Sequence, residues 1–214
     1  MLHVDVGGAT LALLPERAAY LPAQRTLLVA DVHVGKAASF RGLGVPVPAG
    51  TTDGTLARLA AALAASGATQ LVMLGDFVHS ARSYARATLD ALARWREAHA
   101  ALSITLLRGN HDARAGEPPS WLGIETVDAP LRCGPLLLAH EPEPRPDAYV
   151  LAGHVHPCVV VGGRGFDRLR LPCFHFGARV GVLPAFGEFT GWHALPRGEG
   201  DRVFAIAGGR VHEV

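Results

Sequence analysis

The sequence predicts an α/β fold with two stacked sheets and helices outside them, and two features of the chain indicate it. Between residues 26 and 107, apolar β-prone runs alternate with segments of helical periodicity. After about residue 120 the helical pattern fades, and short strand-like runs follow one another between glycine and proline turns. The first pattern is typical of a largely parallel sheet with right-handed crossovers, and the second of a more antiparallel sheet packed on it.

The first half of the chain contains a hairpin and three buried strands. Residues 2–6 and 10–14 are predicted as hairpin arms joined across Gly7-Gly8. Continuous apolar runs, as expected for strands covered on both faces, lie at 26–30, 70–74 and 103–107.

Helices are predicted between these strands. Thr51, Thr52 and Asp53 offer N-cap oxygens for a helix that Gly67 is placed to end, and residues 84–99 have the same apolar periodicity. Residues 35–50, which glycines and prolines punctuate, are predicted as a loop. In the second half, strand-like runs lie at 136–139, 148–152, 159–161, 169–174 and 203–207.

Composition indicates one compact domain spanning residues 1–214. The chain is 49% hydrophobic and 18% charged, as in folded globular proteins. Its net charge is +1 and Lys36 is its only lysine, so nucleic-acid binding would need a local basic patch.

The composition also favours a cytoplasmic protein. The chain has no apolar run near the roughly 20 residues that cross a bilayer, so no membrane association is expected, and it does not start like a signal peptide. Three cysteines without a CxxC pair are typical of reduced thiols.

Five short clusters of carboxylate, amide and imidazole side chains follow strand-like runs. In chain order they are Asp31-Val32-His33, Gly75-Asp76, Gly109-Asn110-His111-Asp112, His140 and Gly153-His154-Val155-His156. Because α/β proteins place their sites just past the carboxyl ends of strands, we expect the clusters to converge. A single cluster of this kind is often incidental, but all five in one domain indicate a functional site.

The residue types in these clusters suit divalent metals. Asp31 and His33 are two residues apart and share a face of a regular strand, Asp76 could bridge two ions with its two oxygens, and Asn110 adds a neutral oxygen. Oxygen and nitrogen ligands without thiolate suit Mn, Fe, Zn, Co or Ni. Two adjacent ions of this kind are a known solution for phosphoryl chemistry.

The five clusters together resemble the signature of the calcineurin-like metallophosphoesterases, over roughly residues 26–176. The resemblance implies a four-layer α/β/β/α sandwich of two mixed sheets flanked by helices. It also implies two divalent ions, with manganese favoured, and a division of the ligands between them. The first ion would be bound by Asp31, His33, Asp76 and His156, and the second by Asp76, Asn110, His140 and His154.

The resemblance leaves His111 as a histidine that binds no metal and could protonate the leaving oxygen as general acid. The chain departs from the protein phosphatases of this superfamily, because His79 stands where those enzymes have the aspartate that orients the acid histidine. Protein phosphatase activity is therefore not expected, and either Asp112 or His79 is the candidate orienter.

The segment 31–41, followed by 44–50, resembles the bacterial ligase-associated DNA damage response endonucleases. That resemblance implies a DNA endonuclease that acts in repair beside a helicase and a DNA ligase. Lys36 and Arg41 lie in this segment and are predicted, with Asn110, to contact a substrate phosphate.

Two alternatives stay open at this point. The low net charge suits a small-molecule phosphoesterase acting on nucleotides, cyclic nucleotides or pyrophosphates. A non-catalytic scaffold, the second alternative, predicts eroded ligands, whereas all seven ligands and His111 are present. Residue patterns do not choose the native metal, the strand preference or the oligomeric state.

Overall fold

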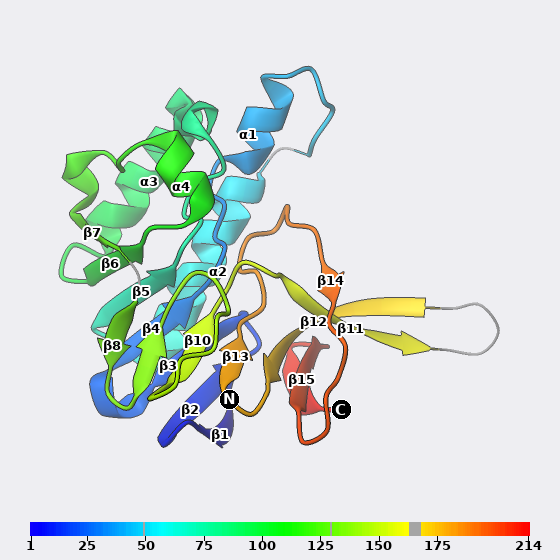
Figure 1. The fold of residues 1–214 in the computed structure, drawn as a ribbon. Helices are drawn as coiled ribbons and strands as arrows, with labels where there is room; N and C mark the ends of the chain where they lie inside the picture. The colour runs from blue at the N-terminus through cyan, green and yellow to red at the C-terminus, as the bar shows by residue number, and fades with distance from the viewer. Residues whose placement is uncertain (49, 129, 163–167) are drawn as a thin grey trace.

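The computed structural model describes residues 1–48, 50–128, 130–162 and 168–214 and consists of two stacked β-sheets with helices beside them (Figure 1). The predicted fold class, α/β with two mixed sheets flanked by helices, is confirmed. None of the helices in these residues is both long and apolar enough to cross a membrane.

The first sheet has seven strands in the same order as in the chain. They are β1 (Leu2–Val6), β2 (Ala9–Leu14), β3 (Ala18–Leu21), β4 (Thr26–Val29), β5 (Gln70–Leu74), β6 (Ser103–Leu107) and β7 (Ile124–Val127). Strands β1 to β4 are antiparallel, so the predicted hairpin is confirmed, and β4 to β7 are parallel. The expectation of a largely parallel sheet is therefore right for β4 to β7 and wrong for β1 to β4. The sequence pattern did not show that β3 links the hairpin to the parallel strands.

The two longest helices cover one face of the first sheet. They are α2 (Thr51–Ser66) and α3 (Arg86–Ala98), and Gly67 ends α2 in the left-handed conformation, as predicted. On this face, Leu27, Leu71 and Ile104 pack against the apolar stripes of the two helices. Burial of these stripes stabilises both helices, since propensity alone seldom does.

The predicted loop 35–50 begins with a helix instead. Residues Lys36–Arg41 form α1, which starts after Gly35 in the left-handed conformation, and residues 42–48, which are rich in glycine and proline, are irregular. A second short helix, α4 (Asn110–Ala115), contains part of the third cluster. Single 3-10 turns occupy Pro22–Gln24, Ala81–Tyr84 and Ser120–Leu122.

The second sheet has nine strands and is mixed. They are β8 (Leu131–Cys133), β9 (Leu136–Leu138), β10 (Tyr149–Ala152), β11 (Pro157–Gly162), β12 (Arg168–Phe176), β13 (Val180–Val182), β14 (His193–Ala194), β15 (Arg202–Ala207) and β16 (Arg210–Glu213). All five strands predicted for this half are present. Strand β10 is parallel to both of its neighbours, β9 and β13, whereas β11, β12 and β15 form antiparallel pairs.

The helices expected outside the second sheet are absent from the described residues, which contain no helix after Leu122. Most strands here are joined by short turns, so few crossover segments remain to form helices. The side chains of Cys173 and His175 on β12 point away from the first sheet. Ala194 and Leu195 lie beside them, where the prediction had a helix.

The core between the two sheets positions the site. Leu28, Leu74 and Leu107 from the first sheet pack against Leu138 and Phe174 from the second. Strands β4, β5 and β6 run parallel, as do β9 and β10, so the carboxyl ends of each set lie at one edge. Each of the five clusters comes directly after one of these strands, and the stacked sheets bring them together.

Candidate metal centre

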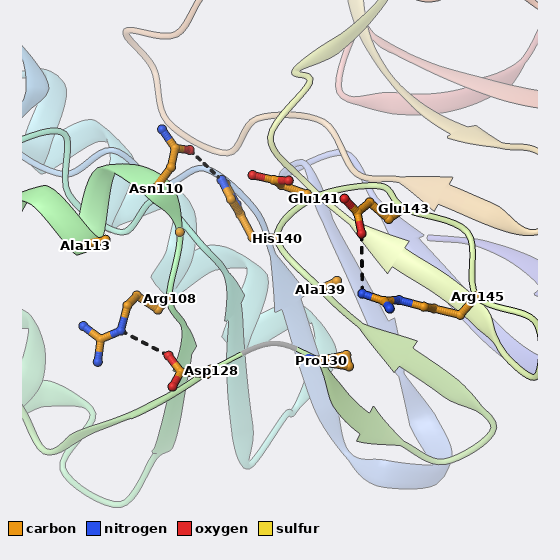
Figure 2. Close-up of a pocket in the computed structure, with 11 residues that line it drawn as sticks. Arg108, Asn110, Ala113, Asp128, Pro130, Ala139, His140, Glu141, Glu143 and Arg145 are labelled. Carbon is orange, nitrogen blue, oxygen red and sulfur yellow. Dashed lines mark hydrogen bonds and ion pairs between the residues drawn. The ribbon is translucent and has the colours of Figure 1, made fainter.

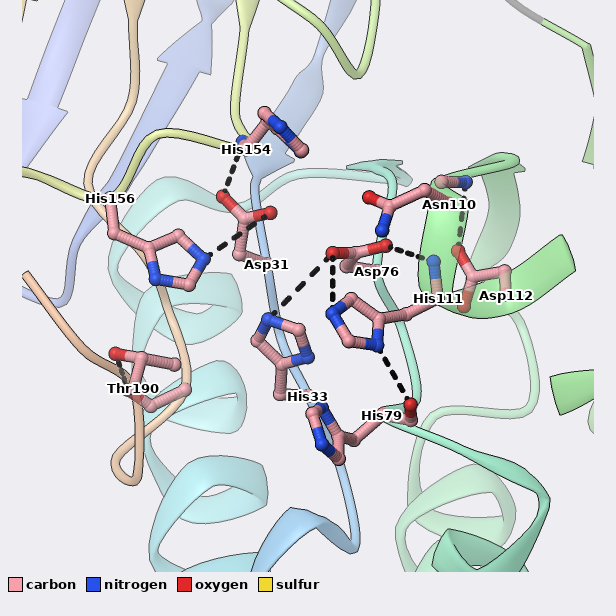
Figure 3. A network of polar contacts seen from close by, with 12 residues as sticks. Asp31, His33, Asp76, His79, Asn110, His111, Asp112, His154, His156 and Thr190 are labelled. Atoms are coloured by element: carbon pink, nitrogen blue, oxygen red, sulfur yellow. Dashed lines mark hydrogen bonds and ion pairs between the residues drawn. The ribbon is translucent and has the colours of Figure 1, made fainter. Parts of the chain in front are cut away.

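The predicted ligands form two groups in space. Asp31, His33 and His156 form the first group, and Asp76, His140 and His154 form the second; within each, ligand atoms lie within 4.8 Å of one another. We call these groups cluster A and cluster B. Figure 3 shows cluster A converging beside Asp76, with Asn110 on the far side of that carboxylate.

Asp76 joins the two clusters, because its carboxylate oxygens face different sides. Oδ2 lies 3.8 Å from His33 Nε2 in cluster A, and Oδ1 lies 3.6 Å from His140 Nε2 in cluster B. The carboxylate is buried, and this burial raises the pKa of Asp76. A buried carboxylate that faces two groups of imidazoles is suited to bridge two cations.

The donor set of cluster B fits a cation. His140 Nδ1 donates to the carbonyl of Leu74 at 3.0 Å, so in a neutral ring Nε2 presents a lone pair. That nitrogen lies 3.0 Å from both Asn110 Oδ1 and His154 Nδ1. The lone pair of Nε2 therefore faces the acceptor oxygen of Asn110, and a bound cation would make this contact favourable.

Cluster A contains an unpaired acceptor. Asp31 Oδ2 accepts a hydrogen bond from the backbone N–H of His154 at 2.8 Å, whereas the buried Oδ1 has no hydrogen-bond partner among the described residues. His156 Nε2 lies 3.7 Å from that oxygen. Because an unpaired buried carboxylate oxygen is costly, its position fits coordination of a metal.

The backbone at the ligands is strained. Seven residues other than glycine have positive φ in the described parts of the chain. Five of them are predicted ligands: Asp31, His33, Asp76, His154 and His156. A left-handed conformation costs such residues roughly 1 kcal/mol or more each, and strain of this kind concentrates at functional sites.

Glycines allow the clusters to approach one another. A Cβ at Gly75 would collide with the His140 ring, one at Gly109 would collide with the Asp76 carboxylate, and one at Gly153 would lie 2.7 Å from Asp31 Oδ2. These three glycines, each at the start of its cluster, therefore provide the space that the ligands need.

Backbone carbonyls orient three of the histidines. His140 Nδ1 donates to the carbonyl of Leu74, as described above. In the same way, His156 Nδ1 lies 3.1 Å from the carbonyl of Gly191, and His111 Nδ1 lies 2.8 Å from the carbonyl of His79. In each case Nδ1 is the N–H donor, so Nε2 faces the centre. No sequence pattern signals a backbone carbonyl, and the sequence analysis missed these partners.

His111 lies beside the bridging carboxylate without joining either cluster. Its Nε2 is 4.0 Å from Asp76 Oδ2, and its backbone N–H donates to Asp76 Oδ1 at 3.0 Å. The His79 ring lies against the His111 ring in a tilted arrangement, with centroids 4.5 Å apart and planes inclined by 30°. Of the two candidate orienters, His79 therefore contacts His111 through both its carbonyl and its ring.

Asp112 has a different place. Its carboxylate accepts hydrogen bonds from the backbone N–H groups of Gly109 at 3.0 Å and Val78 at 3.2 Å. Among the described contacts it makes no hydrogen bond to the His111 ring. Asp112 thus ties the β5 and β6 loops together and holds α4 in place.

Burial also sets the protonation of the histidines. It lowers the pKa of His33 far below its ordinary value, with nearby Lys36 and His156 adding to the effect. Burial, with Lys36 and His111, lowers the pKa of His79 to about 4. His33 is therefore neutral at physiological pH, as a metal ligand must be.

The predicted phosphate contacts differ in position. Lys36 is half-buried and lines a small cavity together with His33 of cluster A. Burial lowers the pKa of Lys36, whereas the negative charges of Asp76 and Asp31 act in the opposite sense. Arg41 Nη1 donates to the carbonyls of Pro48 at 3.0 Å and Val47 at 3.4 Å, so its guanidinium is engaged within its own loop. The structure brings Lys36, but not Arg41, toward the site.

Comparisons with known proteins show what this chain is similar to. The family model described as calcineurin-like phosphoesterase matches residues 24–134. The crystal structure of the Pseudomonas putida nuclease MPE is similar, with 46% sequence identity, a TM-score of 0.87, and coverage of 100% of this chain and 99% of that one. The phosphoesterase Yfce from E. coli is 16% identical with a TM-score of 0.40, covering 88% of this chain and 97% of its own. No match was found among curated proteins.

Proposed function

Since the chain belongs to the calcineurin-like phosphoesterase family, and is therefore a metal-dependent phosphoesterase, we propose that it is a nuclease that hydrolyses phosphodiester bonds in DNA. The similar structure from Pseudomonas putida is that of a nuclease and aligns over the whole chain. The proposal includes a role in DNA repair beside a helicase and a DNA ligase, which the sequence resemblance suggests.

The observation that carries the proposal is the position of Asp76. One oxygen of its buried carboxylate faces cluster A and the other faces cluster B. The seven ligands proposed above would hold two divalent ions, which, when bound, supply an activated water and neutralise charge on the ester oxygens. Neutral imidazoles and carboxylates suit manganese, with Fe, Zn, Co or Ni as alternatives.

His111 is the proposed general acid. The carbonyl of His79 keeps the proton of the ring on Nδ1, so a second proton on Nε2 faces the centre and can pass to the leaving oxygen. The His79 ring lies beside the His111 ring, with 4.5 Å between their centroids. Lys36, which lines a small cavity together with His33, is the proposed contact for a substrate phosphate.

A small phosphodiester is the second candidate substrate. The net charge of +1 and the engagement of Arg41 by its own loop favour it over avid DNA binding by this chain alone. The two candidates share their site and their reaction, so substrate assays must separate them.

One set of assays tests the proposal. The manganese-loaded protein is incubated with supercoiled plasmid, bis-p-nitrophenyl phosphate and p-nitrophenyl phosphate. We expect nicked plasmid and diester hydrolysis, both lost in Asp76→Asn and reduced about 10²–10⁴-fold in His111→Ala. The matched controls Asp147→Asn and His212→Ala change exposed residues and should keep full activity.

The outcomes separate the candidates. Diester hydrolysis without nicking of plasmid would support the small-molecule candidate and contradict the nuclease. Hydrolysis of the monoester alone would contradict both. Elemental analysis gives an independent check, because a protein that binds no transition metal contradicts the metal centre itself.

A further inference from the structure

A cavity of about 360 Å³ opens beside cluster B (Figure 2). Asn110 and His140, two of the proposed ligands, form one of its walls. A phosphate held at the metal centre would therefore lie at the mouth of this cavity. Its volume is in the range of sites that bind small molecules.

The floor of the cavity is made of small and apolar residues. Pro130 and Ala139 lie between the rims, and Ala113 lines the cavity from α4, on the side of Arg108 and Asn110. Figure 2 shows Ala139 and Pro130 between the polar side chains of the two rims. Such a surface is suited to the face of a nucleobase or the carbons of a sugar, since both bury apolar area.

The rims carry paired charges. On one side Arg108 forms ion pairs with Glu117 at 2.6 Å and with Asp128 at 3.4 Å. On the other side Arg145 lies 3.5 Å from Glu143. These pairs present both hydrogen-bond donors and acceptors, which is what the edge of a nucleobase requires.

The net charge of the lining is unsuited to a phosphate. Among the described residues that line the cavity, the three carboxylates of Asp128, Glu141 and Glu143 outnumber the two guanidinium groups of Arg108 and Arg145. A second phosphate placed there would meet uncompensated negative charge. Lys36, the cation near the clusters, lines a separate cavity with His33 of cluster A.

We propose that this cavity is a nucleoside subsite, which takes the base and sugar of one nucleotide while its phosphate lies on the metal centre. The assignment rests on the proposed function and adds a subsite to it. One nucleoside next to the scissile phosphate is bound in this cavity. The other phosphates of the strand pass on the side of Lys36. The enzyme thus contacts one nucleotide closely and the rest of the strand loosely.

Binding of small ligands tests the subsite without relying on turnover. Isothermal titration of the manganese-loaded protein compares inorganic phosphate, thymidine 5′-phosphate, thymidine 3′-phosphate and thymidine 3′,5′-bisphosphate. We expect one of the two monophosphates to bind about tenfold tighter than inorganic phosphate, or ~1.4 kcal/mol. The isomer that does so identifies which neighbour of the scissile phosphate is bound.

Filling the cavity should remove that gain. Ala113→Trp adds an indole to the lining of the cavity, and we expect the monophosphate to bind no better than inorganic phosphate, whose own affinity stays unchanged. If tryptophan at this position harms folding, Ala113→Leu takes its place. We expect Ala113→Leu to lose part of the gain. Arg114→Trp is the matched control, because Arg114 is the exposed neighbour on α4 and does not line the cavity.

Two results would overturn the subsite. One is equal affinity of the wild-type protein for inorganic phosphate and both monophosphates. The other is a bisphosphate that binds tighter than either monophosphate and loses this gain in Ala113→Trp, which would make the cavity a phosphate site. Either result leaves the nuclease proposal intact if plasmid is still nicked, so the two proposals fail separately.

Discussion

Gly109→Ala is expected to disable the metal centre while leaving the fold in place. Gly109 is buried at the start of α4, with φ −91° and ψ 173°, a conformation that alanine adopts without strain. The added methyl group, however, would lie 2.5 Å from the backbone nitrogen of Asp76 and would collide with Asp76 Oδ1. The substitution therefore acts on the bridging carboxylate and on little else.

The size of the effect follows from this contact. Cβ atoms do not approach other heavy atoms within 3.0 Å, so either Asp76 or the β6 loop must move by several tenths of an ångström. Overpacking of this kind costs about 1–3 kcal/mol of stability. A misplacement near 1 Å in a catalytic site costs about 100-fold in rate, so kcat/KM should fall by roughly that factor.

The assay combines three measurements: kcat/KM for bis-p-nitrophenyl phosphate, bound metal by elemental analysis, and Tm. We expect lower activity, less than the wild-type metal content and a modestly lower Tm. Gly162→Ala is the control, because none of the described residues lies within 4 Å of its added methyl group. Wild-type metal content and activity in Gly109→Ala would show that this close approach does not position Asp76.

Three further predictions follow from the same contacts. His79→Ala keeps the carbonyl that binds His111 Nδ1, so kcat/KM should fall by less than the roughly 10²–10⁴-fold of His111→Ala; an equal fall would give the His79 ring a role of its own. Asp112→Ala leaves the backbone N–H groups that it binds without partners and should lower the free energy of unfolding in urea by roughly 2–4 kcal/mol; unchanged stability would contradict the tie between the loops. Burial raises the pKa of Cys173 to about 12, so at pH 8 a thiol reagent should modify the partly exposed Cys133 first, and early modification of Cys173 in the native protein would disprove its burial.

Much of the fold could be predicted because its signals are local. The apolar runs of β4, β5 and β6 and the glycine that ends α2 are properties of a few consecutive residues. The strands β3, β13 and β14, with four residues or fewer, have too few side chains to show an alternation. They form because neighbouring strands satisfy their backbone hydrogen bonds, which only the tertiary structure provides.

The loop predicted at 35–50 shows the limit of composition. Its glycines and prolines lie mostly after Arg41, and the six residues before them form α1. The prediction of helices outside the second sheet came from the expected order of layers, whereas the described residues contain no helix after Leu122.

By itself the sequence determined which chemical groups meet at the centre. Carboxylates, imidazoles and an amide after buried strands can only converge at one edge of the sheets, and their chemistry indicates divalent ions. The resemblance of the sequence also predicted that His111 belongs to the site without being needed as a ligand.

The tertiary structure alone decided how these groups are oriented. The carbonyls that orient His111, His156 and His140 lie 32, 35 and 66 residues away along the chain, and every residue type offers the same carbonyl. Asp112, predicted beside the acid, ties two loops together because the folded backbone places two N–H groups against it. Residue types decide what a site can bind, whereas packing across the chain decides which atom faces it.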